Sequence, residues 1–363
     1  MKKNQLNIFF SSSLMHWNAT LNKRLMPWKG ETDAYKIWLS EIILQQTRVE
    51  HGWDYYNRFV KKYPTVKKLA DAKESDVFKL WEGLGYYSRC KNLIASAKFI
   101  AKELNGKFPG TYSAILKLKG VGPYTAAAIA SFAFNQPYAV VDGNVSRVLA
   151  RFFSIDLAID STGGKSFFAG LAQELLDEPN AGLYNQAIMD FGATICKPRL
   201  PLCSICILKK KCKAFRKGLV NVLPVKEKKI VKKQRWFYYI IAERQQKFYI
   251  KKRTAKDIWQ NLHEFILIEE NTKLTNNQVF GTDIFRQVAG IDYTVESVSE
   301  FYTQQLTHQT IHGCFIHIKI AQKPGLADYM FLTSDELSFL AFPKFINNYL
   351  RQPENPVSIA YHL

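Results

Sequence analysis

The densest chemistry in the chain is a group of cysteines in the order Cys-x6-Cys-x2-Cys-x5-Cys, namely Cys196, Cys203, Cys206 and Cys212. Four thiolates in one loop can wrap a cubane iron–sulfur cluster, and the short x2 step lets two neighbours reach adjacent irons. Zinc is the rival, because four cysteines also make tetrahedral zinc sites, although usually from two Cys-x2-Cys pairs. The spacing therefore favours a [4Fe–4S] cluster and leaves zinc open.

Two acidic residues have local settings that suit acid–base chemistry. Glu41 lies in KIWLSEIILQQTRVE, where a helix would bring Ile37 and Leu44 next to it. Partial burial would raise the pKa of its carboxyl and keep a proton available for general acid work. Asp142 lies in AVVDGNVSRVLARF, just before a predicted helix, where amide donors would keep it ionised and able to stabilise a cation. An exposed helical glutamate and a plain helix N-cap are the ordinary alternatives.

A glycine turn precedes Asp142 in the segment LKLKGVGPYTAAAIASF, residues 116–132. Gly120 and Gly122 allow a tight turn with bare backbone amides, and the next helix is expected to begin near Pro123. Amides beside a helix N-terminus form a phosphate site that reads no base sequence. A Gly-x-Gly turn is also typical of many ordinary loops, so on its own this segment is weak evidence for a phosphate site.

The overall charge points to a polyanionic partner. The chain has 50 Lys and Arg against 31 Asp and Glu, a formal charge of +19. Such a surplus is typical of nucleic-acid-binding proteins, but it does not separate DNA from RNA or anionic lipid. The sequence has no membrane-spanning run and no signal-peptide pattern. We therefore expect a monomeric protein without membrane contact, cytoplasmic and nucleoid-associated in a bacterium.

The elements that must position these residues fall into two kinds. Apolar residues recur at helical spacing through 1–220, for example at Tyr35, Trp38, Leu39 and Ile42. After a basic stretch, PVKEKKIVKKQR, runs such as WFYYIIAE and CFIHIKIA are rich in aromatic and β-branched residues, as strands are. The sequence thus predicts an all-α domain over 1–223, a linker over 224–235 and an α+β domain over 236–363.

These motifs together resemble the endonuclease III and MutY superfamily of DNA glycosylases. The cysteine spacing matches its cluster loop at 196–212, and residues 113–132 are similar to its helix-hairpin-helix, with Lys119 where the family usually has proline. SEIILQQTRVE, MPWK, GLGYYSRCKNL and YNQAIMDFGATIC resemble the MutY-type adenine DNA glycosylases in particular. The resemblance implies excision of adenine opposite 8-oxoguanine or guanine in duplex DNA, with a structural [4Fe–4S] cluster.

The resemblance also assigns catalytic roles. Glu41 would protonate N7 of a flipped-out adenine, and Asp142 would stabilise the oxocarbenium-like sugar or trap it covalently. Asn144 and Tyr124 match residues that position water and hydrogen-bond the catalytic glutamate. Tyr124 stands where the bifunctional glycosylase–lyases carry a Schiff-base lysine, so the implied enzyme is monofunctional. The nearby Lys119 leaves trace lyase activity open.

Further residues match the family's contacts with DNA. Trp28, Lys29 and Gln186 fall where the family lines its adenine pocket, and Lys29 replaces an arginine there, which removes a planar fork. By resemblance the residues beside the lesion, which keep the duplex open or bind DNA, are Gln46, Thr47, Leu84 and Tyr86.

The second domain resembles the family's MutT-like (Nudix-fold) lesion-recognition domain, most clearly in KKRTAKDIWQNLHEFILIE. FRQVAGID, at 285–292, lacks the magnesium-binding carboxylates of Nudix hydrolases, so this domain is expected to bind without hydrolysing. LTHQ falls where the family has a Phe-Ser-His loop for 8-oxoguanine. Thr307 keeps the hydroxyl and His308 the imidazole, whereas Leu306 replaces the aromatic residue.

Three rival functions stay open at this point. A pyrimidine glycosylase–lyase of the endonuclease III type is disfavoured by Tyr124 and by the second domain. A non-catalytic iron–sulfur DNA-binding protein is disfavoured by Glu41 and Asp142 in motif context. A nucleotide hydrolase built on the C-terminal fold is disfavoured by the missing carboxylates.

Overall fold

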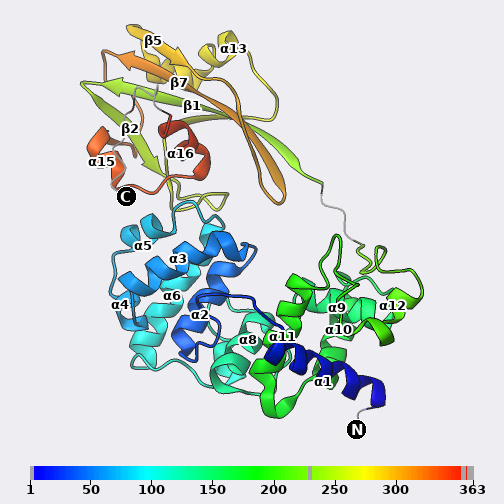
Figure 1. Ribbon diagram of the computed structural model, residues 1–363. Coiled ribbons are helices and arrows are strands. Elements are labelled where there is room, and N and C mark those ends of the chain that lie inside the picture. The colour runs from blue at the N-terminus through cyan, green and yellow to red at the C-terminus, as the bar shows by residue number, and fades with distance from the viewer. Residues whose placement is uncertain (1–3, 228–230, 353–356, 358–363) are drawn as a thin grey trace. The chain divides into compact units, whose positions relative to one another are not determined.

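A computed structural model describes residues 4–227, 231–352 and 357 of the chain. The chain divides into two compact units, one of residues 1–71 and 91–229 and one of residues 72–90 and 230–363 (Figure 1). Part of the predicted linker, 228–230, lies outside the described residues. Its last residues, 233–235, belong to the first strand of the second unit.

The first unit is helical throughout its described residues. Its helices, including the end of α6, which begins in the other unit, are α1 (Gln5–Thr20), α2 (Ala34–Leu44), α3 (Val49–Lys62), α4 (Val66–Ala70), α6 (Tyr87–Glu103), α7 (Tyr112–Ile115), α8 (Pro123–Phe134), α9 (Gly143–Phe153), α10 (Thr162–Leu175), α11 (Ala181–Thr194) and α12 (Lys213–Arg216). Two short 3-10 turns, η1 (Glu178–Asn180) and η2 (Lys209–Lys211), complete it.

The core of this unit forms where α1, α9 and α11 pack together. α9 buries Val148, Leu149 and Phe152 at the helical spacing of its apolar residues, and Phe10 of α1 meets Phe152 with ring centroids 4.7 Å apart. α8 packs on α2, and its run of alanines is buried, so the two helices can approach closely. The helical prediction for this part is confirmed.

The predicted hairpin lies between α7 and α8. Gly120 has φ +79°, and a Cβ there would lie 2.8 Å from the Cβ of Asn92, so only glycine fits. Gly122 caps α8 with an extended backbone, and Pro123 is the first residue of the helix. Ser96 donates a hydrogen bond to the carbonyl of Lys119 (3.1 Å), which ties the turn to α6.

The second unit is built on a mixed sheet. Its strands are β1 (Lys233–Arg244), β2 (Lys247–Lys252), β3 (His263–Glu264), β4 (Ile266–Glu270), β5 (Tyr293–Val298), β6 (Tyr302–Gln305), β7 (Gln309–Ile320) and β8 (Met330–Thr333). β1 and β7 pair in parallel at the centre, and all other pairings are antiparallel. The helices of this unit are α5 (Glu74–Trp81), α13 (Asn276–Phe280), α14 (Asp283–Ala289), α15 (Ser334–Ser338) and α16 (Lys344–Leu350).

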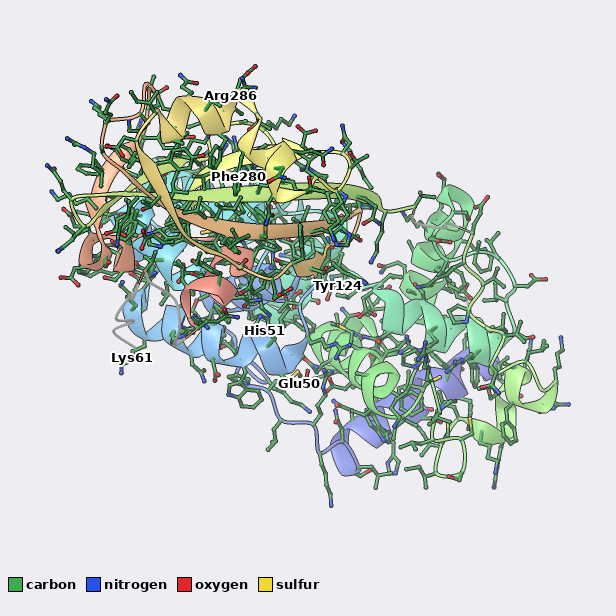
Figure 2. All side chains as sticks on the ribbon, turned by 90° about the horizontal axis from the view of Figure 1, so that it is seen from above. Glu50, His51, Lys61, Tyr124, Phe280 and Arg286 are labelled. Carbon is green, nitrogen blue, oxygen red and sulfur yellow. The ribbon has the colours of Figure 1, made fainter. Side chains whose placement is uncertain are left out.

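Both faces of the sheet are covered, which explains why the middle of β1, residues 236–242, is apolar and does not alternate. Tyr238 and Ile240 pack with α13 and α14, the helices that carry Phe280 and Arg286 in Figure 2. Tyr239, on the other face, meets Phe345 of α16 at 6.3 Å. The prediction of a helical domain followed by an α+β domain is therefore confirmed.

The second unit includes a segment that the predicted domain boundaries placed in the helical domain. Residues 72–90, which include α5, group with the second unit. Lys79 donates to the carbonyl of Leu340 (2.8 Å), and the amide of Phe342 donates to Glu82 (2.8 Å). In the described part of the chain, no helix is long and apolar enough to cross a membrane.

Candidate active site

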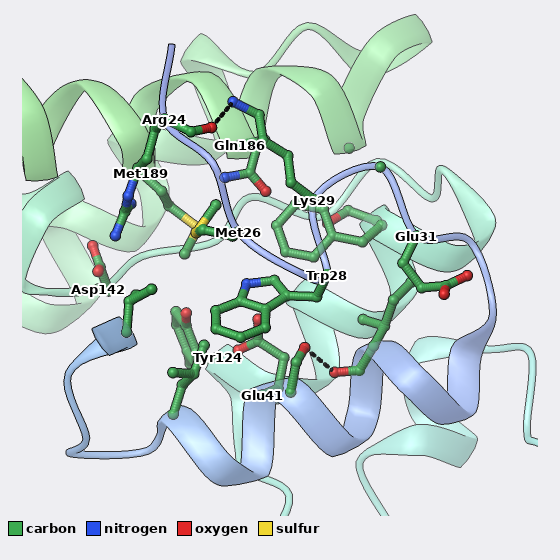
Figure 3. Close-up of a pocket in the computed structure, with 18 of the residues that line it drawn as sticks. Arg24, Met26, Trp28, Lys29, Glu31, Glu41, Tyr124, Asp142, Gln186 and Met189 are labelled. Atoms are coloured by element: carbon green, nitrogen blue, oxygen red, sulfur yellow. Dashed lines mark hydrogen bonds between the residues drawn. The ribbon is translucent and has the colours of Figure 1, made fainter. Parts of the chain in front are cut away.

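A single large pocket in the first unit gathers most of the predicted catalytic residues. Its volume is about 830 Å³, which is ample for a nucleobase and part of its sugar. The α1–α2 connection, α2, α8, α9 and α11 contribute its walls (Figure 3). The predicted site residues that line it are Trp28, Lys29, Glu41, Gln46, Thr47, Tyr124, Asp142, Asn144 and Gln186.

Glu41 is buried because α2 is apolar on nearly every side, and the residue is only 7% exposed. Burial in these surroundings, opposed by a hydrogen bond with Tyr124 and assisted by the charge of Asp142, raises the pKa of Glu41 to about 7. A carboxyl with this pKa still carries its proton in a large part of the molecules at neutral pH. The local argument from the sequence anticipated this direction of shift.

Asp142 caps α9 and accepts hydrogen bonds from Val145 N (2.7 Å) and Asn144 Nδ2 (2.8 Å). Burial nevertheless raises the pKa of Asp142 above its ordinary value, although these hydrogen bonds and the charge of Arg147 oppose the rise. The sequence argument, which considered only the local donors, did not anticipate this rise. The two acids thus differ in their donors, because Asp142 accepts from a backbone and a side-chain N–H while the Tyr124 hydroxyl is the donor to Glu41.

Arg147, which the sequence argument missed, joins this site to the cysteine loop. Its guanidinium donates to Asn144 Oδ1 (2.8 Å), to the carbonyl of Cys196 (2.8 Å) and to the carbonyl of Gly192 (2.7 Å). Asn144 in turn holds Asp142, so a continuous chain of hydrogen bonds runs from the acid to the first cysteine. Arg147 stands three residues after Asn144 on α9, which was the available signal.

A second missed residue, Asp190, organises the opposite wall. Its side chain is fully buried and accepts hydrogen bonds from Arg24 Nη1 (2.8 Å) and Gln186 Nε2 (2.9 Å). Lys29 Nζ lies 3.2 Å from the same carboxylate and donates to the carbonyl of Arg24 (3.0 Å). Asn22 Nδ2 also donates a hydrogen bond to the Asp190 carboxylate (2.8 Å). Lys29 is therefore held in the wall by two acceptors.

The remaining predicted DNA-binding residues are not among those that line this pocket. Leu84 is buried, with 5% exposed, whereas Tyr86 is 42% exposed and has φ 49°, a backbone conformation unusual for tyrosine. Within the second unit the hydroxyls of Tyr86 and Thr307 are 2.6 Å apart, and His308 is exposed next to Thr307. Gly120 and Gly122 form the hairpin turn described above.

The four clustered cysteines line one small cavity, together with Arg151. Arg151 donates to Cys196 Sγ at 3.5 Å and to the carbonyl of Lys197 at 2.7 Å. Among the described residues, no group of three or more His, Cys, Asp or Glu side chains is arranged to hold a metal ion. The four cysteines are thus neighbours around one cavity.

Comparison with known proteins agrees with this architecture. Residues 39–162 match the family model of the HhH-GPD superfamily base excision DNA repair proteins, and residues 237–352 match that of the NUDIX domain. A solved structure of a thermostable thymine-DNA glycosylase, 31% identical, covers 59% of this chain and 98% of that chain with a TM-score of 0.55. An endonuclease III–DNA covalent intermediate, 19% identical with a TM-score of 0.52, shares the fold.

Curated relatives carry the similarity across both units. An adenine DNA glycosylase of Buchnera aphidicola subsp. Schizaphis graminum is 34% identical over 309 residues, which cover 84% of this chain and 85% of that protein. The human adenine DNA glycosylase is 44% identical over 214 residues, covering 56% of this chain and 39% of that protein. The chain therefore belongs to the adenine DNA glycosylases, DNA-acting enzymes of base excision repair.

Proposed function

We propose that this enzyme flips adenine out of duplex DNA, where it faces 8-oxoguanine or guanine, and hydrolyses its bond to the sugar. The observation that carries the proposal is the pair of buried acids at one pocket, Glu41 with a pKa of about 7 and Asp142 with more hydrogen-bond donors. Departure of adenine needs a proton on N7 and leaves positive charge on the sugar. Glu41 supplies the proton, and ionised Asp142 faces the developing cation.

Two further residues keep this pair in order. Tyr124 hydrogen-bonds Glu41 and so limits the rise of its pKa, which keeps the carboxyl able to give up its proton. Asn144 Nδ2 fixes one oxygen of Asp142, while its own Oδ1 is held by Arg147. In this arrangement Asn144 orients Asp142, and the resemblance assigns it the positioning of the attacking water.

The enzyme is proposed to be monofunctional. A lyase needs an amine that can attack the sugar carbon, and position 124 offers a phenol instead. The lysine that does line the pocket, Lys29, is paired with Asp190 and with the carbonyl of Arg24. An ammonium held in this way is a poor nucleophile, so strand scission should require added alkali.

Recognition of the mispair is assigned to residues around and beyond the pocket. Gln46 and Thr47 lie at the pocket rim after α2, and the exposed Tyr86 ring can stack on a base, a contact that contributes roughly 1–3 kcal/mol. Leu84 is buried, so its insertion into DNA would require a rearrangement of this segment. The opposite base, 8-oxoguanine or guanine, is assigned to Thr307 and His308.

The grip on the duplex backbone is assigned to two further places. At the hairpin, the turn at Gly120 and Gly122 precedes α8, whose N-terminus favours an anion. The basic run after the third clustered cysteine, Lys209–Lys211, supplies positive charge for phosphate.

The cysteine loop is proposed to hold a [4Fe–4S] cluster on Cys196, Cys203, Cys206 and Cys212. The four cysteines line one cavity, and their Cys-x6-Cys-x2-Cys-x5-Cys spacing has one Cys-x2-Cys pair where zinc sites usually have two. When bound, the cluster would brace loop 196–212. Iron, zinc and acid-labile sulfide measured on the purified protein test the assignment: one zinc per chain with no iron would overturn it.

One assay tests the reaction. Purified protein is given duplexes with adenine opposite 8-oxoguanine, adenine opposite guanine, or an oxidised pyrimidine, each with and without alkali. Release of adenine that needs alkali for strand scission is the expected result. Scission at the pyrimidine without alkali would identify a glycosylase–lyase instead. Glu41→Gln should abolish release and retain duplex binding, and release that survives this change refutes the assignment of the acid.

A further inference from the structure

Asp190 occupies an unusual position in the wall of the proposed adenine pocket. It is a fully buried carboxylate on α11, and its two oxygens serve different partners. Oδ1 accepts from Arg24 Nη1 (2.8 Å) and Gln186 Nε2 (2.9 Å). Oδ2 accepts from Asn22 Nδ2 (2.8 Å) and lies 3.2 Å from Lys29 Nζ. All four partners present N–H groups to the Asp190 oxygens, and two of them, Arg24 and Lys29, are cations.

This arrangement fixes the orientation of an amide that faces the pocket. An ionised carboxylate only accepts hydrogen bonds, so the amide of Gln186 must turn its nitrogen toward Asp190. The oxygen and nitrogen of an amide are otherwise easily exchanged, and here the neighbouring chemistry settles the choice. Among the described residues Gln186 Oε1 accepts no hydrogen bond, and Gln186 lines the pocket (Figure 3). The pocket wall therefore presents an acceptor at this point.

We propose that Asp190 is a positioning residue that makes the pocket select a purine with an amino group at C6. An outward Gln186 Oε1 can accept a hydrogen bond from an exocyclic amine but repels a carbonyl oxygen. Adenine carries the amine, whereas hypoxanthine and guanine carry a carbonyl at the same carbon. The selection resides in the orientation of Gln186, and Asp190 enforces that orientation without touching the base.

The same carboxylate explains how this chain uses a lysine at position 29. A planar arginine fork could reach Asp190 and a base at once, whereas the ammonium of Lys29 is a compact charge that Asp190 Oδ2 and the Arg24 carbonyl already hold. Lys29 therefore braces the α1–α2 connection against α11. Recognition of the C6 substituent then rests on Gln186. The choice of base therefore depends more strongly on Asp190, which orients the Gln186 amide.

The proposal rests on the adenine glycosylase activity proposed above, and the experiment separates the two. Single-turnover excision is measured with saturating enzyme on duplexes that carry adenine, hypoxanthine or unsubstituted purine opposite 8-oxoguanine. Unsubstituted purine has no group at C6, so it reports the chemistry without the proposed contact. If the wild-type protein releases no adenine, the proposed function fails before the role of Asp190 is tested.

Three variants carry the test. Gln186→Met should slow adenine release about tenfold, the effect of one lost hydrogen bond, while release of unsubstituted purine stays near the wild-type rate. Asp190→Asn should produce the same selective loss and lower the preference for adenine over hypoxanthine, because either amide may then turn. Asn22→Ala removes a donor to the other oxygen and should leave the preference unchanged.

The possible outcomes decide between positioning and simple support of the fold. An equal loss on all three bases in Asp190→Asn would show a merely structural role and overturn the proposal. A selective loss in Gln186→Met without one in Asp190→Asn would leave the contact of Gln186 but remove the role of Asp190. If Asp190→Asn does not fold, Asp190→Glu keeps the charge for Arg24 and Lys29 but displaces the acceptor, and the same selective loss is expected.

Discussion

Replacing Glu41 by glutamine should stabilise the protein at alkaline pH while it removes the activity. The reason is that burial raises the pKa of Glu41 from its ordinary 4.5 to about 7. Below pH 4.5 the carboxyl is protonated in both the folded and the unfolded chain, and the native state bears no extra cost. As the pH rises from 4.5 to 7, only the unfolded chain ionises freely, so the wild-type protein loses stability that glutamine keeps.

The size of the effect follows from the shift in pKa. A rise of one unit corresponds to about 1.4 kcal/mol, so the difference between 4.5 and about 7 predicts a loss of about 3 kcal/mol once the pH passes 7. At pH 5 most of this loss has not yet developed, and about 1 kcal/mol is expected. Little screening by solvent applies, because Glu41 is only 7% exposed.

Urea denaturation of wild type and Glu41→Gln at pH 5 and pH 8 measures the difference directly, followed by a signal from the helical unit. The advantage of the variant should grow by roughly 2 kcal/mol between the two pH values. Glu103→Gln is the matched control, because the Glu103 side chain is 54% exposed and its loss should add no pH dependence. A Glu41→Gln advantage that is the same at pH 5 and pH 8 would refute the burial argument.

Three other predictions follow from the same geometry. Excision by the wild-type enzyme should fall as the pH rises through about 7, where Glu41 loses its proton, and a flat rate from pH 6 to 9 would contradict this. Tyr124→Phe removes a hydrogen bond that lowers the pKa of Glu41, so the alkaline limb of the pH–rate profile should move to higher pH. Gly120→Ala should cost about 1–2 kcal/mol of stability and weaken duplex binding, because Gly120 has φ +79° and a Cβ would meet Asn92. Gly122→Ala, where an added Cβ has open space, is its control in thermal denaturation.

The sequence was informative wherever the cause of a feature is local. The burial of Glu41 follows from the apolar residues within one helical turn of it, and the N-cap role of Asp142 from its place before α9. The hairpin was equally accessible, because a Gly-x-Gly sequence favours a turn with positive φ, as at Gly120. Each of these properties depends on neighbours within about four positions in the chain, which a helical pattern exposes.

Features set by distant partners could not be predicted in this way. Asp190 is an acid in an apolar helix, and only the fold brings to it Asn22, 168 residues away. The hydrogen bond between Arg147 and the carbonyl of Cys196 spans 49 residues. Residues 72–90 group with the second unit, where Lys79 donates to the carbonyl of Leu340, 261 residues further along. The sequence argument therefore missed both Arg147 and Asp190, since nothing within a few positions of either residue identifies what it binds.

The rise in the pKa of Asp142 shows why the two acids must be considered together. The enclosure that keeps a proton on Glu41 also penalises charge on Asp142, since both side chains face the same pocket. The proposed chemistry needs the pair to hold one proton, not two or none. The pocket meets this need by giving Asp142 two directed hydrogen bonds and the nearby charge of Arg147, while Glu41 has the hydrogen bond with the Tyr124 hydroxyl. The asymmetry between the acids is therefore built from their donors, and weakening the Asn144–Arg147 contact should raise the pKa of Asp142 further.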